Sequence, residues 1–184
     1  MRVLAGTLKG QRLTTPPGRT TRPTADQVRI ACLDTLMPFL DLGPFLDLFA
    51  GAGGVGIEAL SRGAPSAVFV EQDGAALRAL RDNVERLGLT DQARVVRADA
   101  ARAVGDLEAA GERFGVVFLD PPYDSPRAAA ALEAVAAGPV LVAGALVVIQ
   151  HGTKTPPAAA GALALWKARR FGETTLTFFR RRVD

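Results

Sequence analysis

The sequence predicts an α/β fold: a doubly wound, mostly parallel, seven-stranded sheet. Short apolar runs alternate with helical segments between residues 45 and 149. Alternation of this kind is typical of parallel strands joined by right-handed helical crossovers, with both faces of the sheet covered. After His151 the alternation ends, and two extended segments joined at Gly172 favour an antiparallel hairpin at the end of the sheet.

The length and composition are those of one soluble domain. At 184 residues the chain is long enough to bury a core without disulfides, and its one cysteine, Cys32, is expected in that core. We expect residues 1–43 to form an extension and residues 44–184 the main body of a single domain spanning 1–184. No apolar run approaches the roughly 20 residues of a membrane span, and no signal-peptide pattern is present, so a cytoplasmic protein is expected.

The first 43 residues are predicted to form a hairpin followed by a helix. Residues 1–13 predict a short basic hairpin or two small strands around a Leu-Lys-Gly turn, and residues 14–23, rich in Thr, Pro, Gly and Arg, predict a loop. Thr24 is the predicted N-cap of a helix over residues 25–40.

The remaining elements follow from the same alternation. Strands are predicted at 45–49, 67–70, 94–96, 116–119 and 146–149, and helices at 54–61, 75–87, 100–110 and 127–137. A loop begins at Pro156-Pro157, and the hairpin strands are predicted at 163–171 and 174–182.

Charge is concentrated at the two ends of the chain. Residues 1–36 and residues 166–184 each carry six basic and two acidic residues, whereas the segment between them is acidic. Basic ends on an acidic body suggest a polyanionic partner, although they could also be solvated ends of an ordinary domain.

The stretch Asp120-Pro121-Pro122-Tyr123 directly follows a buried strand. The two prolines stiffen the chain, so the Asp120 carboxylate and the Pro121 carbonyl form a rigid set of acceptors at the strand tip. Such acceptors suit a planar amino group, and the Tyr123 ring could stack on the heterocycle that carries it. The alternative is a strand-terminating turn with a surface tyrosine.

A second motif stands at the end of the first core strand. Gly51 and Gly53 would let the backbone approach a ligand, and Glu71, twenty residues after Gly51, could accept hydrogen bonds from a ribose diol. With Gly56 the glycines also match the fingerprint of nicotinamide enzymes, which therefore remain a competing class.

Two further carboxylates favour S-adenosylmethionine over a dinucleotide. Asp47 would bind the cofactor's ammonium group but would repel a pyrophosphate, and Asp99 could accept from an adenine amine. Each acid alone could be a helix cap, but four successive strands end in Asp47, Glu71, Asp99 and Asp120.

With these residues the chain resembles a class I S-adenosylmethionine-dependent methyltransferase of Rossmann-like fold, and more narrowly the bacterial RsmD family. The narrower resemblance rests on Arg2-Val3-Leu4-Ala5-Gly6, on the run from Arg22-Pro23-Thr24 to Arg29, on Asp47-Leu48-Phe49-Ala50-Gly51 and on Leu60-Ser61-Arg62-Gly63. It implies transfer of a methyl group to the N2 amine of one guanine in small-subunit (16S) ribosomal RNA.

The resemblance assigns a role to each candidate residue. The catalytic residues would be Asp120, Pro121, Pro122 and Tyr123. The cofactor residues would be Asp47, Phe49, Ala50, Gly51, Gly53, Glu71, Gln72, Asp99, Ala100 and Asp120. RNA would be held by Arg2, Lys9, Arg12, Arg22, Thr24, Arg29, Arg180 and Arg181.

The expected partner is ribosomal RNA or an assembling 30S subunit, with no metal and no membrane, and the expected state is a monomer. His151 is expected to be a surface turn residue. An adenine-N6 methyltransferase acting on DNA or RNA, and a protein glutamine methyltransferase, remain alternatives because both require recognition of a planar amine.

Overall fold

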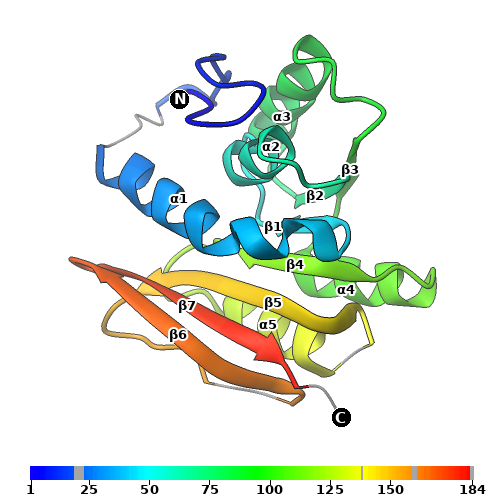
Figure 1. Cartoon of the computed structure of the whole chain (residues 1–184), viewed down its shortest axis with the longest axis vertical. Coiled ribbons are helices and arrows are strands. Elements are labelled where there is room, and N and C mark those ends of the chain that lie inside the picture. The colour runs from blue at the N-terminus through cyan, green and yellow to red at the C-terminus, as the bar shows by residue number, and fades with distance from the viewer. Residues whose placement is uncertain (19–22, 138, 159–160, 183–184) are drawn as a thin grey trace.

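The structure is a computed structural model that describes residues 1–18, 23–137, 139–158 and 161–182 (Figure 1). Its helices are α1 (Pro23–Leu36), the 3₁₀ helix η1 (Met37–Leu42), α2 (Gly54–Ser61), α3 (Gly74–Arg86), α4 (Ala100–Ala109) and α5 (Pro126–Ala137). Its strands are β1 (Phe45–Leu48), β2 (Ala67–Glu71), β3 (Ala93–Arg97), β4 (Phe114–Leu119), β5 (Leu141–Gly152), β6 (Leu163–Phe171) and β7 (Thr174–Arg181).

The seven strands form one sheet in the order β3-β2-β1-β4-β5-β7-β6. The first five are parallel, whereas β7 is antiparallel to both β5 and β6. The predicted doubly wound sheet with an antiparallel C-terminal hairpin is therefore confirmed. The chain moves outward from β1 in one direction and returns to β4 on its other side, so a topological switch point lies between β1 and β4.

Two apolar layers cover the sheet. On one face, residues of α1, α2 and α3 pack with the side chains of Phe45, Phe69 and Phe178, and Cys32 lies in this layer as predicted. On the other face, α4 and α5 pack over Leu46, Val117 and other strand residues. Figure 1 shows α1 and η1 crossing the face opposite to α4 and α5.

The N-terminal segment differs from the prediction in detail. It folds back on itself, but the paired residues amount to one isolated antiparallel bridge between Arg2 and Arg12 rather than two strands. Helix α1 begins at Pro23, so Thr24 lies within its first turn instead of capping it. Proline suits this first helical position because its φ is already helical and its missing N–H is not needed there. None of the described helices is both long and apolar enough to cross a membrane.

Gly56 allows α2 to pack closely on the sheet. A Cβ at Gly56 would lie 2.3 Å from Cε1 of Phe69 and 3.0 Å from Oδ2 of Asp47. We therefore expect Gly56→Ala to lower the free energy of unfolding by about 1–3 kcal/mol, since the buried ring and helix must shift.

The matched control is Gly105→Ala on helix α4, where an added Cβ meets no atom within 4 Å. This change should raise stability by up to about 1 kcal/mol because alanine favours the helix. Urea unfolding of both variants measures the difference, and equal stability of the two would contradict the packing role of Gly56.

Candidate active site

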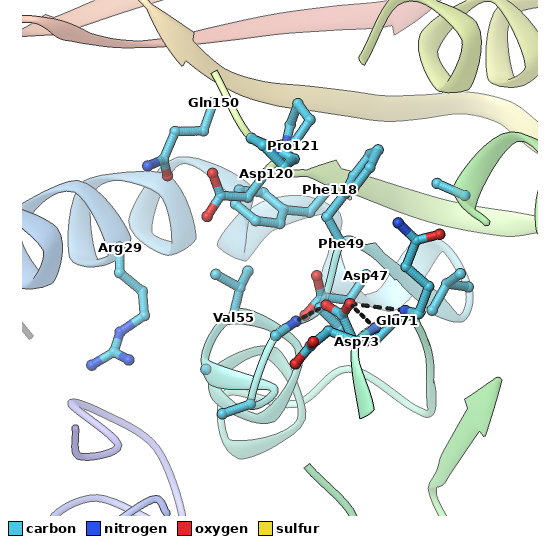
Figure 2. Close-up of a pocket in the computed structure, with 18 of the residues that line it drawn as sticks. Arg29, Asp47, Phe49, Val55, Glu71, Asp73, Phe118, Asp120, Pro121 and Gln150 are labelled. Carbon is cyan, nitrogen blue, oxygen red and sulfur yellow. Dashed lines mark hydrogen bonds between the residues drawn. The ribbon is translucent and has the colours of Figure 1, made fainter. Parts of the chain in front are cut away.

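A pocket of about 920 Å³ opens at the carboxyl ends of β1, β2 and β4, beside the switch point (Figure 2). This is the edge at which open α/β sheets bind ligands. Most of the predicted cofactor and catalytic residues line it, namely Asp47, Phe49, Ala50, Gly51, Glu71, Gln72, Asp99, Ala100, Asp120, Pro121, Pro122 and Tyr123.

The turn after β1 adopts an unusual backbone conformation. Phe49 has φ 63°, in the left-handed region that a bulky residue rarely occupies, and Gly51 has φ 58°. A Cβ at Gly51 would meet nothing within 4 Å, so this part of the turn faces open space in the pocket. Gly51 thus leaves its backbone accessible to a ligand.

Gly53 does not have the cofactor-binding role that was predicted for it. It does not line the pocket, and a Cβ there would lie 2.5 Å from Cδ1 of Leu80 in α3. With φ 90° as well, Gly53 is required for helix packing and for the turn that starts α2, rather than for close approach of a ligand.

Glu71 organises the turn from the end of β2. Its Oε2 accepts from the backbone N–H of Gly51 at 2.8 Å, and its Oε1 accepts from the N–H groups of Gln72 at 2.8 Å and Asp73 at 2.9 Å. Two separate loops are therefore held together by one carboxylate. Figure 2 shows these bonds meeting at Glu71.

Asp47 is a buried carboxyl beneath the turn. Its Oδ2 accepts from the N–H of Gly56 at 2.9 Å, and its side chain is 1% exposed. Burial raises the pKa of Asp47 to about 8; the Gly56 bond opposes this rise, while Asp120 and Glu71 add to it. A cation bound nearby would favour the ionised form.

Asp99 acts as a helix cap in this structure. Its Oδ1 accepts a hydrogen bond from the N–H of Arg102 at 3.2 Å, at the start of α4. Asp73, which was not predicted as a site residue, caps α3 in the same way by accepting from the N–H of Ala76 at 2.8 Å. The cap interpretation is therefore correct for Asp99. Both side chains still line the pocket.

Asp120, Pro121, Pro122 and Tyr123 follow β4 directly. Asp120 is exposed to the pocket and Pro121 is buried, so the strand tip is fixed while its carboxylate faces outward. The Tyr123 hydroxyl lies 2.9 Å from Oγ1 of Thr174, the first residue of β7, although the side chain is 51% exposed. The C-terminal hairpin thus contacts the motif.

Gln150 lines the same part of the pocket, from β5, and was missed by the sequence reasoning. Figure 2 shows its side chain on the same side of the pocket as Asp120. The sequence could have indicated it, because Gln150 directly follows the predicted strand at 146–149, just as the candidate acidic residues stand at the ends of the other predicted strands.

The prediction for His151 is wrong. It is a strand residue of β5, 8% exposed, with Nε2 at 2.7 Å from Oγ1 of Thr177 and Nδ1 at 2.8 Å from the carbonyl oxygen of Gly152. The strand extends to Gly152 because β7 pairs with it along its whole end. Among the described residues no cluster of His, Cys, Asp or Glu could hold a metal ion.

The predicted RNA-binding residues are not brought together. Arg2, Lys9 and Arg12 are exposed on the N-terminal segment, whose first residue, Met1, helps to line the pocket. Lys9 lies farther away, because its N–H donates to Gly6, which packs on Ser61 at the C-terminal end of α2. Arg180 pairs with Leu146, whereas Thr174 pairs with Gly152, so Arg180 lies about 20 Å from the pocket end of the hairpin at roughly 3.3 Å per residue.

Arg181, beside Arg180, donates to the carbonyl oxygen of Leu141, at the opposite edge of the sheet. Arg29 is buried and lines the pocket instead of an open surface. Arg22 and the side chain of Thr24 lie outside the described part of the chain.

Comparisons with known proteins agree with this architecture. The model of the family described as "Conserved hypothetical protein 95" matches residues 1–180. The chain is 38% identical over 186 residues to a Bacillus subtilis protein named "Putative rRNA methyltransferase YlbH", covering 99% of this chain and 100% of that protein.

It is also 32% identical over 157 residues to the Ribosomal RNA small subunit methyltransferase D of Haemophilus influenzae, covering 85% of this chain and 81% of the relative. The solved structure of the Escherichia coli protein yhhF superposes with a TM-score of 0.86 at 27% identity, covering 100% of this chain and 99% of that chain.

Proposed function

This chain belongs to the RsmD family, and we propose that it transfers a methyl group from S-adenosylmethionine to the exocyclic N2 amine of a guanine in small-subunit ribosomal RNA. The observation that carries the proposal is the meeting of two motifs in one pocket: the glycine-rich turn after β1 and Asp120-Pro121-Pro122-Tyr123 after β4. Relatives named as rRNA methyltransferases support the reaction and the substrate class.

The acidic lining of the pocket fits S-adenosylmethionine. Asp47, Glu71, Asp99 and Asp120 all line it, and such a set suits a ligand that carries a sulfonium and an ammonium group, with Asp47 ionising as the cation binds. The same carboxylates would repel the pyrophosphate of a nicotinamide cofactor. Glu71 and Asp99 would hold the adenosine part, and Asp47 the ammonium.

When bound, S-adenosylmethionine supplies an electrophilic methyl group. The protein residues have to position the amine, since a guanine amine is a poor nucleophile whose lone pair is delocalised into the ring. The Asp120 carboxylate and the Pro121 carbonyl would accept hydrogen bonds from its two N–H groups and align the nitrogen with the methyl group. The methylated amine would then give up one proton, with S-adenosylhomocysteine as the second product. Tyr123 would stack on the flipped base.

Two other targets share this logic. An adenine amine or a glutamine amide could be held by the same acceptors at the end of β4. The exposed basic residues of the N-terminal segment favour RNA over a protein substrate, and the names of the relatives favour ribosomal RNA.

The raised pKa of Asp47, about 8, gives a test of cofactor binding. Below pH 8 the free protein holds a proton on Asp47, and binding of a cation releases it. We therefore expect the affinity for S-adenosylhomocysteine to rise with pH, by up to about tenfold per unit, between about pH 6 and pH 8.

Asp47→Asn keeps an acceptor for Gly56 but cannot titrate, so it should lose both affinity and this pH dependence. Calorimetry in buffers of different ionisation enthalpy measures the released proton. A flat profile for the wild-type protein would contradict the role of Asp47, and tighter binding of NAD than of S-adenosylhomocysteine would contradict the cofactor.

For RNA we propose a surface that extends from the pocket edge over the N-terminal segment. It consists of Arg2, Lys9 and Arg12 from the N-terminal segment and of Lys154 and Arg170 from the pocket end of β5 and β6. All five are exposed. Arg170 pairs with Thr175 beside the Tyr123 contact, which brings this side of the surface to the site of the proposed chemistry.

Substitution of this surface should weaken RNA binding through lost phosphate contacts. We expect Lys9→Gln and Arg170→Gln each to lower the slope of log affinity against log salt by about one. Arg180→Gln is the matched control, because Arg180 stacks on Phe39 and Trp166 away from the pocket. Filter binding to small-subunit RNA measures the slopes, and a larger effect from Arg180 than from Arg170 would overturn the assignment of the surface.

A further inference from the structure

Arg29 is a buried cation whose hydrogen bonds are incomplete. Its side chain is 7% exposed, and Nη2 donates to the carbonyl oxygen of Arg2 at 2.6 Å and to Oδ1 of Asp26 at 3.2 Å. Nε has no hydrogen-bond partner among the described residues. Burial lowers the pKa of Arg29, while Glu58 and Asp26 oppose the shift. A buried guanidinium whose hydrogen bonds are incomplete is costly, so an anion bound against its pocket side would stabilise it.

The nearby acid Glu58 does not fill this gap. Its two oxygens accept from the backbone N–H groups of Leu4 and Ala5, each at 2.8 Å, and from Nε of Arg62 at 3.2 Å. Asp26, the one acid among the described residues that bonds Arg29, is 42% exposed and reaches only Nη2. The positive charge is thus only partly balanced, and Nε itself is covered by protein atoms.

Arg29 lines the pocket at its α1 end, next to the start of α2. A Cβ on Gly54 would lie 3.1 Å from Nη1 of Arg29, which shows how closely the guanidinium approaches the first residue of α2. Asp47 bonds the N–H of Gly56 in the same turn of this helix. One cation and one buried acid therefore stand at the first turn of α2.

We infer that Arg29 binds the carboxylate of the methionine part of S-adenosylmethionine, an inference that rests on the proposed function. Glu71 and Asp99 line the part of the pocket proposed for adenosine, and Figure 2 shows Arg29 on the α1 side, across from Glu71. Asp47 for the ammonium and Arg29 for the carboxylate match the zwitterion in sign. The N-terminal end of α2 adds a favourable dipole for the anion.

An RNA phosphate is the other anion that Arg29 could bind. The burial of the side chain argues against it, because Arg2 and Met1 lie against the guanidinium and a bulky polynucleotide would have to displace them. A carboxylate carried by a small ligand would instead approach through the pocket, which Arg29 lines. Arg29 is therefore assigned to the cofactor rather than to the RNA surface.

The test compares two ligands that differ in one group: S-adenosylmethionine and its decarboxylated form, which keeps the amine and the sulfonium. We expect the wild-type protein to bind the carboxylated ligand about 10- to 100-fold more tightly, since a charge-assisted hydrogen bond to a buried group is lost with the carboxylate. In Arg29→Gln this preference should fall to within about threefold. Calorimetry of the full chain gives both constants.

Arg127→Gln removes a charge from the same pocket lining, on α5, and should retain the preference. Arg29→Lys, which keeps the charge without the planar fork, should retain part of it. Binding of the decarboxylated ligand at wild-type affinity shows that Arg29→Gln is folded.

The outcomes separate the inference from the proposed function. If the wild-type protein binds neither ligand, the proposed cofactor is wrong and the inference falls with it. If it binds both ligands equally, or if Arg29→Gln weakens both by the same factor, the cofactor stands and the role of Arg29 is overturned. Loss of RNA binding with unchanged preference between the ligands would assign Arg29 to phosphate instead and would also overturn it.

Discussion

Asp120→Ala is expected to reduce turnover by about 10²- to 10³-fold while the affinity for S-adenosylhomocysteine stays within about threefold of wild type. The carboxylate would accept a hydrogen bond from the reacting amine, so its loss removes both orientation and charge at the nitrogen. The side chain is exposed to the pocket, and its removal creates no cavity in the core.

Cofactor binding should not suffer, because Asp120 raises the pKa of Asp47 by repulsion and its removal eases ionisation of that buried carboxyl. Asp124→Asn is the matched control: it removes a charge from the same loop, and asparagine tolerates its φ of 59°. Single-turnover methyl transfer and calorimetry measure the two effects. Turnover within tenfold of wild type would exclude the proposed role of Asp120.

Glu71→Ala has the second large expected effect, a loss of cofactor affinity of about 100-fold or more. Two causes combine: the acceptors proposed for the ribose disappear, and three backbone N–H groups, those of Gly51, Gln72 and Asp73, lose their shared acceptor. The turn that faces the pocket would then no longer be fixed in shape.

Glu71→Gln serves as the conservative variant. It keeps one oxygen acceptor but places an amide donor against the remaining N–H groups, so an intermediate loss is expected. Calorimetric titration with S-adenosylhomocysteine measures both variants, and their unfolding midpoints without ligand show whether the fold survives. A Glu71→Ala protein that is folded and binds within fivefold of wild type would show that Glu71 holds neither the ribose nor the turn.

The sheet was predictable because its signals are local. Helix α2 and strand β6 have the predicted bounds, since each is set by a glycine or proline turn beside an apolar pattern. Strand β5 is longer than predicted, running from Leu141 to Gly152, because Ala143 and Gly144 interrupt the apolar run and a register shift against β4 accommodates them. The bounds of β5 therefore depend on its pairing with β4, a strand distant in sequence, and not on local sequence alone.

The candidate site was predictable where residues stand at strand ends. Carboxyl ends of parallel strands share one edge, so Asp47, Glu71 and Asp120 could be expected in one pocket. Arg29 and His151 were predicted to be exposed, Arg29 because of its charge and His151 because of its turn-like context, but both are buried. The helical pattern could have corrected the prediction for Arg29, since Arg29 lies three residues before buried Cys32 and seven before buried Leu36 on one helix face. The burial of His151 depends on Thr177, 26 residues away, which local sequence does not reveal.

The most direct measurement is methyl transfer itself. The protein is incubated with methyl-labelled S-adenosylmethionine and small ribosomal subunits that lack the modification, the RNA is digested, and the labelled nucleoside is identified; Asp120→Ala is run in parallel. We expect label in N2-methylguanosine for the wild-type protein and none above background for the variant. Label in N6-methyladenosine would move the target to adenine, and label in protein with none in RNA would contradict the proposed function.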